Sequence, residues 1–172
     1  AKTVLVDEAS EPGGSLLSEP SVEIAGKPAW DWLAAGLDEL RALPNVTLMS
    51  RTTAIGYYHQ NMVGLCEKLT DHLSTLPKDA PRERMWRVRA GQVVLAQGAL
   101  ERPLVFDGND RPGVMLAGSA QTYLNRYGVK VGNRAVIVTS HDSAWHTAFD
   151  LADAGVMVAA IVDTRADVAP EL

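Results

Sequence analysis

Residues 135–163 contain the pattern that most restricts the fold of this chain. An apolar run, a polar turn, a stretch with helical spacing and a second apolar run follow one another, and Asp163 ends the last run. Gly155 marks the end of the helical stretch. Its small and apolar side chains share one face: Ala144, Ala148, Leu151 and Ala152. Two strands joined by a helix pair in parallel through a right-handed crossover, so the pattern predicts an α/β fold with buried strands.

The turn of this unit lacks the feature that binds a dinucleotide. A phosphate-binding turn needs glycines, because the backbone must approach pyrophosphate at the N-terminus of the helix. Residues 139–143 read Thr-Ser-His-Asp-Ser, and Asp142 brings a negative charge to the place of the phosphates. We interpret 135–163 as a Rossmann-like scaffold without a dinucleotide, in which Asp163 is a strand-end acid without a ribose.

The start of the chain has acids and glycines that suit a nucleotide but no glycine-rich turn before them. The run TVLV at 3–6 reads as a strand covered on both faces, and Asp7, Glu8 and then a Gly13-Gly14 pair follow it. A strand-end acid binds ribose in dinucleotide folds, about 20 residues after a G-x-G-x-x-G turn, and no such turn precedes these acids. These features alone fit either nucleotide binding or an ordinary end of a strand.

A helix and an antiparallel insertion are predicted between these two regions. Residues 27–44 place apolar side chains at helical spacing between two prolines, and a short strand follows at 46–50. The section 52–98 reads as an antiparallel β meander with turns at 59–61 and 90–91.

The last strand of this meander ends at Gly98, which lets the backbone pass close to a ligand. A connector rich in glycine and proline follows, in which we expect Arg102 to form a structural salt bridge. A short helix at 118–128 then has Ser119 as its predicted N-cap.

Composition and charge exclude several classes of function. The net charge of -5 argues against a nucleic-acid or anionic-membrane partner, and no apolar run is long enough to span a membrane. Cys66 is the single cysteine, so an internal disulfide is excluded and we expect a buried residue on a strand. The four histidines lack metal-ligand spacing, and no catalytic constellation is visible. No catalytic residue and no metal ligand is therefore assigned.

Three stretches carry a resemblance to a known family. The run GALERPLVFDGNDRPGVMLA is the most specific, and VDEASEPGGSL and RTTAIGYYHQN accompany it. They resemble the α subunits of heterotetrameric sarcosine oxidases. The resemblance implies an incomplete two-domain, disulfide-reductase-like nucleotide-binding architecture of the α/β class with an inserted meander. Residues 1–112 would be part of the first dinucleotide-binding domain, without its glycine-loop strand and return strand, and 113–172 the start of a second Rossmann-like domain.

The same resemblance implies a non-catalytic NAD in the first domain. By position in the family's motifs, the acids after the first strand meet the adenosine ribose, and Glu8 is the better candidate for a bidentate contact. Small residues elsewhere approach the dinucleotide, adenine or pyrophosphate. The residues implied to contact NAD are Asp7, Glu8, Ala9, Gly14, Ser15, Ala54 and Gly98.

Family resemblance also implies the function of the parent complex. Sarcosine oxidases of this kind oxidatively demethylate sarcosine to glycine, transfer the one-carbon unit to tetrahydrofolate and produce hydrogen peroxide. FAD, FMN and tetrahydrofolate are implied elsewhere in the complex, with β, γ and δ subunits as partners in the cytoplasm. The segment alone is expected to be inactive and to bind NAD no more tightly than about millimolar.

Two other interpretations fit the residues. The chain could be a segment of an opine or proline/hydroxyproline dehydrogenase, which would hold FAD in this domain. It could also be an interaction module without a nucleotide. The length of the match through DGNDRPGVMLA favours sarcosine oxidase over the dehydrogenases.

Overall fold

The computed structural model describes residues 1–168, which form two compact units. The first unit comprises residues 1–14 and 23–98, and the second comprises 15–22 and the described residues from 99 onward. The division into a first dinucleotide-binding domain at 1–112 and a second Rossmann-like domain at 113–172 stays a prediction. The last four residues of the second domain, 169–172, lie outside the described residues. Among the described residues, no helix is both long and apolar enough to cross a bilayer.

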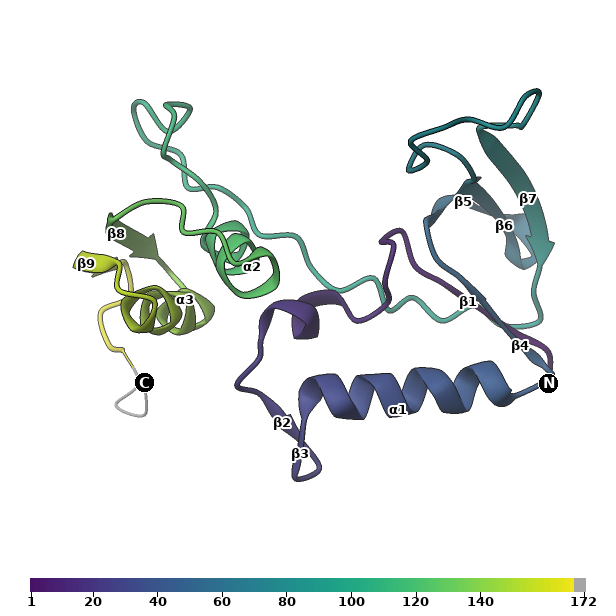
Figure 1. The fold of residues 1–172 in the computed structure, drawn as a ribbon, viewed down its shortest axis with the longest axis horizontal. Coiled ribbons are helices and arrows are strands. Elements are labelled where there is room, and N and C mark those ends of the chain that lie inside the picture. The colour runs from purple at the N-terminus through teal and green to yellow at the C-terminus, as the bar shows by residue number, and fades with distance from the viewer. Residues whose placement is uncertain (169–172) are drawn as a thin grey trace. The chain divides into compact units, whose positions relative to one another are not determined.

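The first unit begins with a parallel strand pair and a long helix. Strand β1 (Thr3–Val6) pairs in parallel with β4 (Val46–Met49). Between them lie the 3₁₀ helix η1 (Gly14–Ser18), the short hairpin of β2 (Glu23–Ile24) and β3 (Lys27–Pro28), and helix α1 (Ala29–Ala42). Figure 1 shows α1 following directly on this hairpin. The helix predicted within 27–44 is thus confirmed. A proline next to each end, Pro28 and Pro44, limits its length.

Burial of β1 differs from the prediction. Val4 and Leu5 are each 43% exposed, although their run was expected to be covered on both faces. A parallel strand is buried only where elements pack on each face of its sheet, and among the described residues β1 pairs with a single strand, β4.

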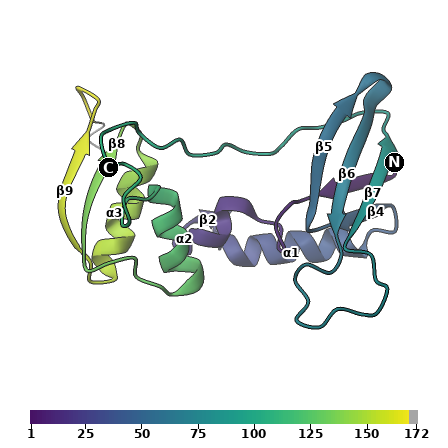
Figure 2. The same ribbon diagram turned by 90° about the horizontal axis from the view of Figure 1, so that it is seen from above.

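An antiparallel sheet completes the first unit. Strands β5 (Thr52–Tyr58), β6 (Met62–Lys68) and β7 (Glu83–Arg89) lie side by side in that order (Figure 2), and the 3₁₀ helix η2 (His59–Asn61) forms the first turn. The predicted meander is confirmed for these three strands. Cys66 lies on β6 but is half-buried rather than buried, and this burial and the Glu83 carboxylate raise the pKa of its thiol.

The strand predicted at 92–98 is wrong. Its residues pair with no described strand, and Val94 and Leu95 are 88% and 69% exposed. An apolar run becomes a strand only when a partner satisfies its backbone hydrogen bonds, and no described element supplies that partner.

The second unit contains the predicted strand–helix–strand motif. Strand β8 (Arg134–Thr139) pairs in parallel with β9 (Met157–Asp163), α3 (Ser143–Asp153) connects them, and α2 (Ala117–Tyr127) packs on α3. The predicted α/β class is confirmed.

Helix α3 covers one face of the β8–β9 pair. The core of this face consists of Ile137, Ala144, Ala148, Leu151 and Val156. Thr147 is buried in place of the predicted Ala152, which is exposed. Gly155 follows the helix at φ +79°, a conformation that favours glycine, as predicted.

Candidate functional site

The loop after β1 is fixed by its own backbone and by Asp7. The Asp7 carboxylate accepts the Ala9 N–H at 2.8 Å, which closes a local turn. The Asp7 N–H donates to the Met49 carbonyl, and the Asp7 carbonyl accepts the Thr52 N–H, both at 2.9 Å. The Ala9 carbonyl accepts the Arg51 N–H at 2.8 Å. Residues 7–9 are therefore held against the connection between β4 and β5.

Glu8 differs from Asp7 in the state of its carboxylate. Its side chain is exposed and makes no hydrogen bond or ion pair with the described residues. One Asp7 oxygen already serves the turn, whereas both Glu8 oxygens are open to a ligand. The structure thus separates the two predicted ribose acids into one that shapes the loop and one that is available to bind.

The other predicted contact residues are only partly brought together. Ala54 lies on β5, two residues after Thr52, next to an irregularity in the pairing of β5 with β6. Gly14 and Gly98 have φ of +56° and +69°, which favours glycine at both positions. Gly98 makes no backbone hydrogen bond to the described residues, and Ser15 belongs to the second unit. The structure therefore gathers Asp7, Ala9 and Ala54 near the start of β5.

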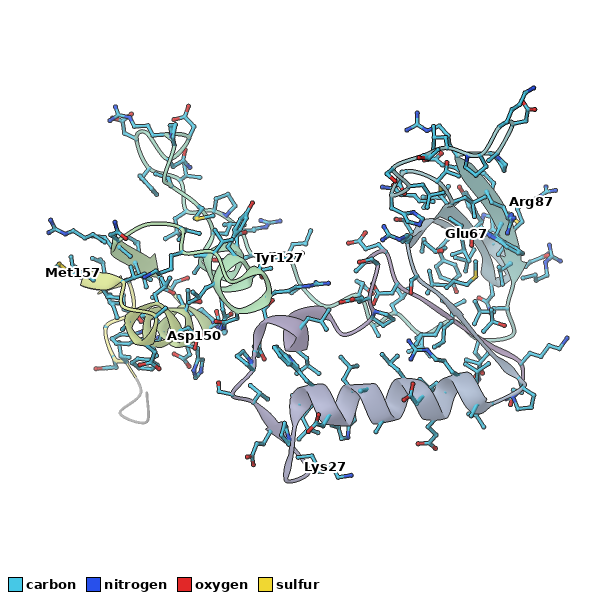
Figure 3. All side chains as sticks on the ribbon, viewed as in Figure 1. Lys27, Glu67, Arg87, Tyr127, Asp150 and Met157 are labelled. Atoms are coloured by element: carbon cyan, nitrogen blue, oxygen red, sulfur yellow. The ribbon has the colours of Figure 1, made fainter. Side chains whose placement is uncertain are left out.

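An open cavity of about 490 Å³ lies elsewhere in the first unit. It is lined by Val4, Thr47, Leu48, Met49, Ser50, Glu67, Trp86 and Val88. Its carboxylate, that of Glu67 (labelled in Figure 3), accepts the indole N–H of Trp86 at 2.8 Å. None of the predicted NAD contacts lines this cavity, although one of its lining residues, Met49, accepts the Asp7 N–H through its carbonyl.

The turn before α3 is occupied by an ion cluster. The Asp163 carboxylate accepts hydrogen bonds from the Trp145 indole at 3.1 Å and from the Arg165 N–H and guanidinium at 2.7–3.0 Å. Arg165 also pairs with Asp142 at 2.6 Å. Hydrogen bonds from Arg165 and Trp145 hold the pKa of Asp163 far below its usual value, and the two carboxylates raise the pKa of Arg165. Sequence reasoning identified Asp142 and Asp163 but missed Arg165, whose position two residues after the acid was the available signal.

Helix α2 is capped by a residue distant in sequence. The Glu101 carboxylate accepts the N–H groups of Ala117 at 3.0 Å and Gly118 at 2.8 Å. A Cβ on Gly118 would come within 2.9 Å of Glu101 Oε2, so glycine permits this approach. The prediction of Ser119 as the N-cap is wrong, because Ser119 lies inside the helix. The carboxylate of Glu101 accepts the first N–H groups instead. Arg102 makes no ion pair with the described residues, contrary to expectation.

Replacing Glu101 with alanine is expected to destabilise α2 by about 1 kcal/mol, the usual cost of a lost helix cap. Hydrogen exchange of the first-turn amides of α2 in the full-length protein measures the effect. Arg102→Ala is the matched control, since it removes a neighbouring charge that caps nothing and should change stability by no more than about 0.5 kcal/mol. Equal exchange in the two variants would show that the carboxylate does not stabilise the helix.

Comparison with curated proteins gives a match over nearly the whole chain. The α subunit of sarcosine oxidase from Rhizobium meliloti (strain 1021) is 51% identical over 165 residues, which is 96% of this chain and 17% of that protein. The resemblance to sarcosine oxidase α subunits is confirmed. An opine oxidase component of the same organism is 30% identical over 174 residues, covering 96% of this chain and 34% of that protein. The higher identity favours the sarcosine oxidase interpretation over the opine alternative.

The fold is shared with a solved structure. The crystal structure of L-proline dehydrogenase from P. horikoshii superposes with a TM-score of 0.72 at 21% identity, over 96% of this chain and 32% of that one. No family model matches the chain. Within residues 1–168, no group of three or more histidine, cysteine or acidic side chains is placed to hold a metal ion. The chain spans about a sixth of the sarcosine oxidase protein that it matches.

Proposed function

We propose that this chain is the NAD-binding segment of a sarcosine oxidase α subunit. The complex would oxidatively demethylate sarcosine to glycine, transfer the one-carbon unit to tetrahydrofolate and reduce oxygen to hydrogen peroxide. The similarity to curated α subunits supports the activity. The observation that carries NAD binding is the exposed, unengaged carboxylate of Glu8 at the end of β1, on a loop that Asp7 fixes.

Each predicted contact residue has a role in this proposal. Glu8 accepts hydrogen bonds from the ribose hydroxyls, and Asp7 and Ala9 hold the loop in position. The backbone of Ala54 addresses the adenine. Gly14, Ser15 and Gly98 bring backbone close to the dinucleotide, and the positive φ of both glycines supports this role.

The rest of the chemistry belongs to other parts of the complex. FAD, FMN and tetrahydrofolate act outside this segment, and the β, γ and δ subunits complete a cytoplasmic heterotetramer. No residue of this chain is proposed as catalytic. The chain would form part of a two-domain, disulfide-reductase-like architecture, which agrees with the fold it shares with a proline dehydrogenase.

We also propose that the unit 135–163 holds no dinucleotide. A ribose-binding acid needs free oxygens, but the Asp163 carboxylate is engaged by Trp145 and Arg165. Asp142 and its partner Arg165 occupy the start of α3, which is where a pyrophosphate would bind in a nucleotide-binding unit.

Mass spectrometry of the nucleotides released from the denatured full-length protein tests the proposal. The expected result is NAD, together with the flavins of the complex. FAD without NAD would contradict NAD binding and support a dehydrogenase of the opine or proline/hydroxyproline type. Absence of every nucleotide would instead support an interaction module.

A further inference from the structure

A polar network holds the segment 15–22 against α2 and α3 within the second unit. Ser18 is buried at 7% exposure. Its carbonyl accepts the Asn125 side-chain amide at 2.8 Å, and the same amide nitrogen donates to Asp150 Oδ2 at 2.7 Å. Asp150, labelled on α3 in Figure 3, also accepts the Gln121 amide at 2.8 Å. Asn125 therefore links the segment to both helices.

Both protons of the Asn125 side-chain amide nitrogen are used in hydrogen bonds. An amide nitrogen carries two protons, and Ser18 and Asp150 take one each. The Ser18 hydroxyl lies 3.1 Å from Thr122 Oγ1, and the Thr122 proton goes to the Gly118 carbonyl at 2.8 Å. The Ser18 hydroxyl must then donate to Thr122. Both the backbone and the side chain of Ser18 are thus fixed by α2.

Fixing Ser18 also fixes the residues that precede it. Gly14 through Ser18 form the 3₁₀ helix η1. Such a helix has three residues per turn, so residues three apart lie one turn from each other. Ser15 is exposed and lies one such turn before Ser18. Gly13 and Gly14 enter the helix with φ of +145° and +56°. The flexible glycine pair is therefore followed at once by an anchored turn.

We infer that Asn125 is a positioning residue for the dinucleotide, because it anchors the turn that carries Gly14 and Ser15. The inference rests on the proposed function, in which both residues approach NAD. Loss of the anchor leaves the Ser18 carbonyl buried without its donor and allows η1 to leave its bound conformation.

The effect on affinity follows from the fraction of protein in which η1 is in place. If this fraction falls to about one tenth, the apparent Kd for NAD rises about tenfold. We therefore expect Asn125→Ala in the full-length protein to raise the Kd for NAD about tenfold and to increase hydrogen exchange across residues 15–22.

Gln121→Ala is the matched control. It removes the other amide that donates to the same Asp150 oxygen, and among the described residues Gln121 makes no side-chain hydrogen bond to 15–22. The Kd for NAD and the exchange of 15–22 should stay at wild-type values, whereas the packing of α2 on α3 is perturbed in both variants. A second test variant, Thr122→Val, keeps the volume of the side chain and removes the acceptor of the Ser18 hydroxyl. We expect it to raise the Kd about threefold, the effect of one weak hydrogen bond.

Calorimetric titration with NAD and hydrogen exchange decide between the outcomes. A wild-type protein that binds no NAD overturns the proposed function and this inference with it. A wild-type protein that binds NAD, with Asn125→Ala and Thr122→Val at unchanged Kd, overturns this inference alone. Equal weakening by Gln121→Ala and Asn125→Ala also overturns it, because α2–α3 packing rather than the anchor would then be responsible.

Discussion

Replacing Glu8 with alanine in the full-length protein is expected to weaken NAD binding about 10- to 150-fold. A charge-assisted hydrogen bond contributes about 1.5–3 kcal/mol, and this range converts to that change in Kd. Glu8 is the acid to change because its exposed carboxylate forms no contact with the described residues. Its removal should leave the fold of the loop intact, so the loss can be attributed to the missing contact.

Two further variants show whether charge or loop shape matters. Glu8→Gln keeps one acceptor oxygen and removes the charge, so an intermediate loss is expected. Asp7→Ala removes the acceptor of the Ala9 N–H and should raise the hydrogen exchange of the loop as well as the Kd. Glu8→Ala should change the Kd without changing the exchange.

Calorimetric titration after removal of bound nucleotide is the measurement. Glu39→Ala, which changes an exposed glutamate on α1, is the control and should keep the wild-type Kd. Flavin content should be the same in all variants, because the flavins are proposed to lie elsewhere in the complex. NAD affinity that is unchanged in Glu8→Ala would remove Glu8 from the site.

Local periodicity made part of the fold predictable. Helix α1 and the β8–α3–β9 motif follow from apolar spacing within a few residues, and the structure has both. The strand at 92–98 failed because pairing depends on a distant partner, which no spacing within the run can reveal. Burial of β1 failed for the same reason, since its cover must come from other elements.

The candidate site divides in the same way. A strand-end acid pair was visible in the sequence, but only the geometry separates Asp7, which closes the turn, from the open Glu8. Glu101 caps α2 across 16 residues and Asn125 anchors Ser18 across 107, and neither link has a local signature. Polar side chains that act over such separations have to be found in the folded structure.

Replacing Asp163 with asparagine is expected to destabilise the β8–α3–β9 motif at neutral pH. The side chain of Asp163 is 6% exposed, and it holds Trp145 of α3 and Arg165 together at the end of β9. Asparagine keeps one oxygen but loses the charge that pairs with the guanidinium. Among the described residues, Arg165 then keeps Asp142 as its one charged partner. We expect faster hydrogen exchange of the α3 amides in the full-length protein, with unchanged NAD affinity.

The pH dependence gives this prediction a specific signature. Because the pKa of Asp163 is depressed in the folded protein, its ionised form stabilises the fold above the usual aspartate pKa of about 3.9. That contribution is lost as the pH falls below this value toward the depressed pKa. The difference in α3 protection between wild type and Asp163→Asn should therefore be constant from pH 7 to about pH 5 and narrow below about pH 4. Asp153→Asn, an exposed change at the end of the same helix, should show no such convergence. A difference that persists unchanged to pH 3 would mean that the geometry of the carboxylate, and not its charge, stabilises the motif.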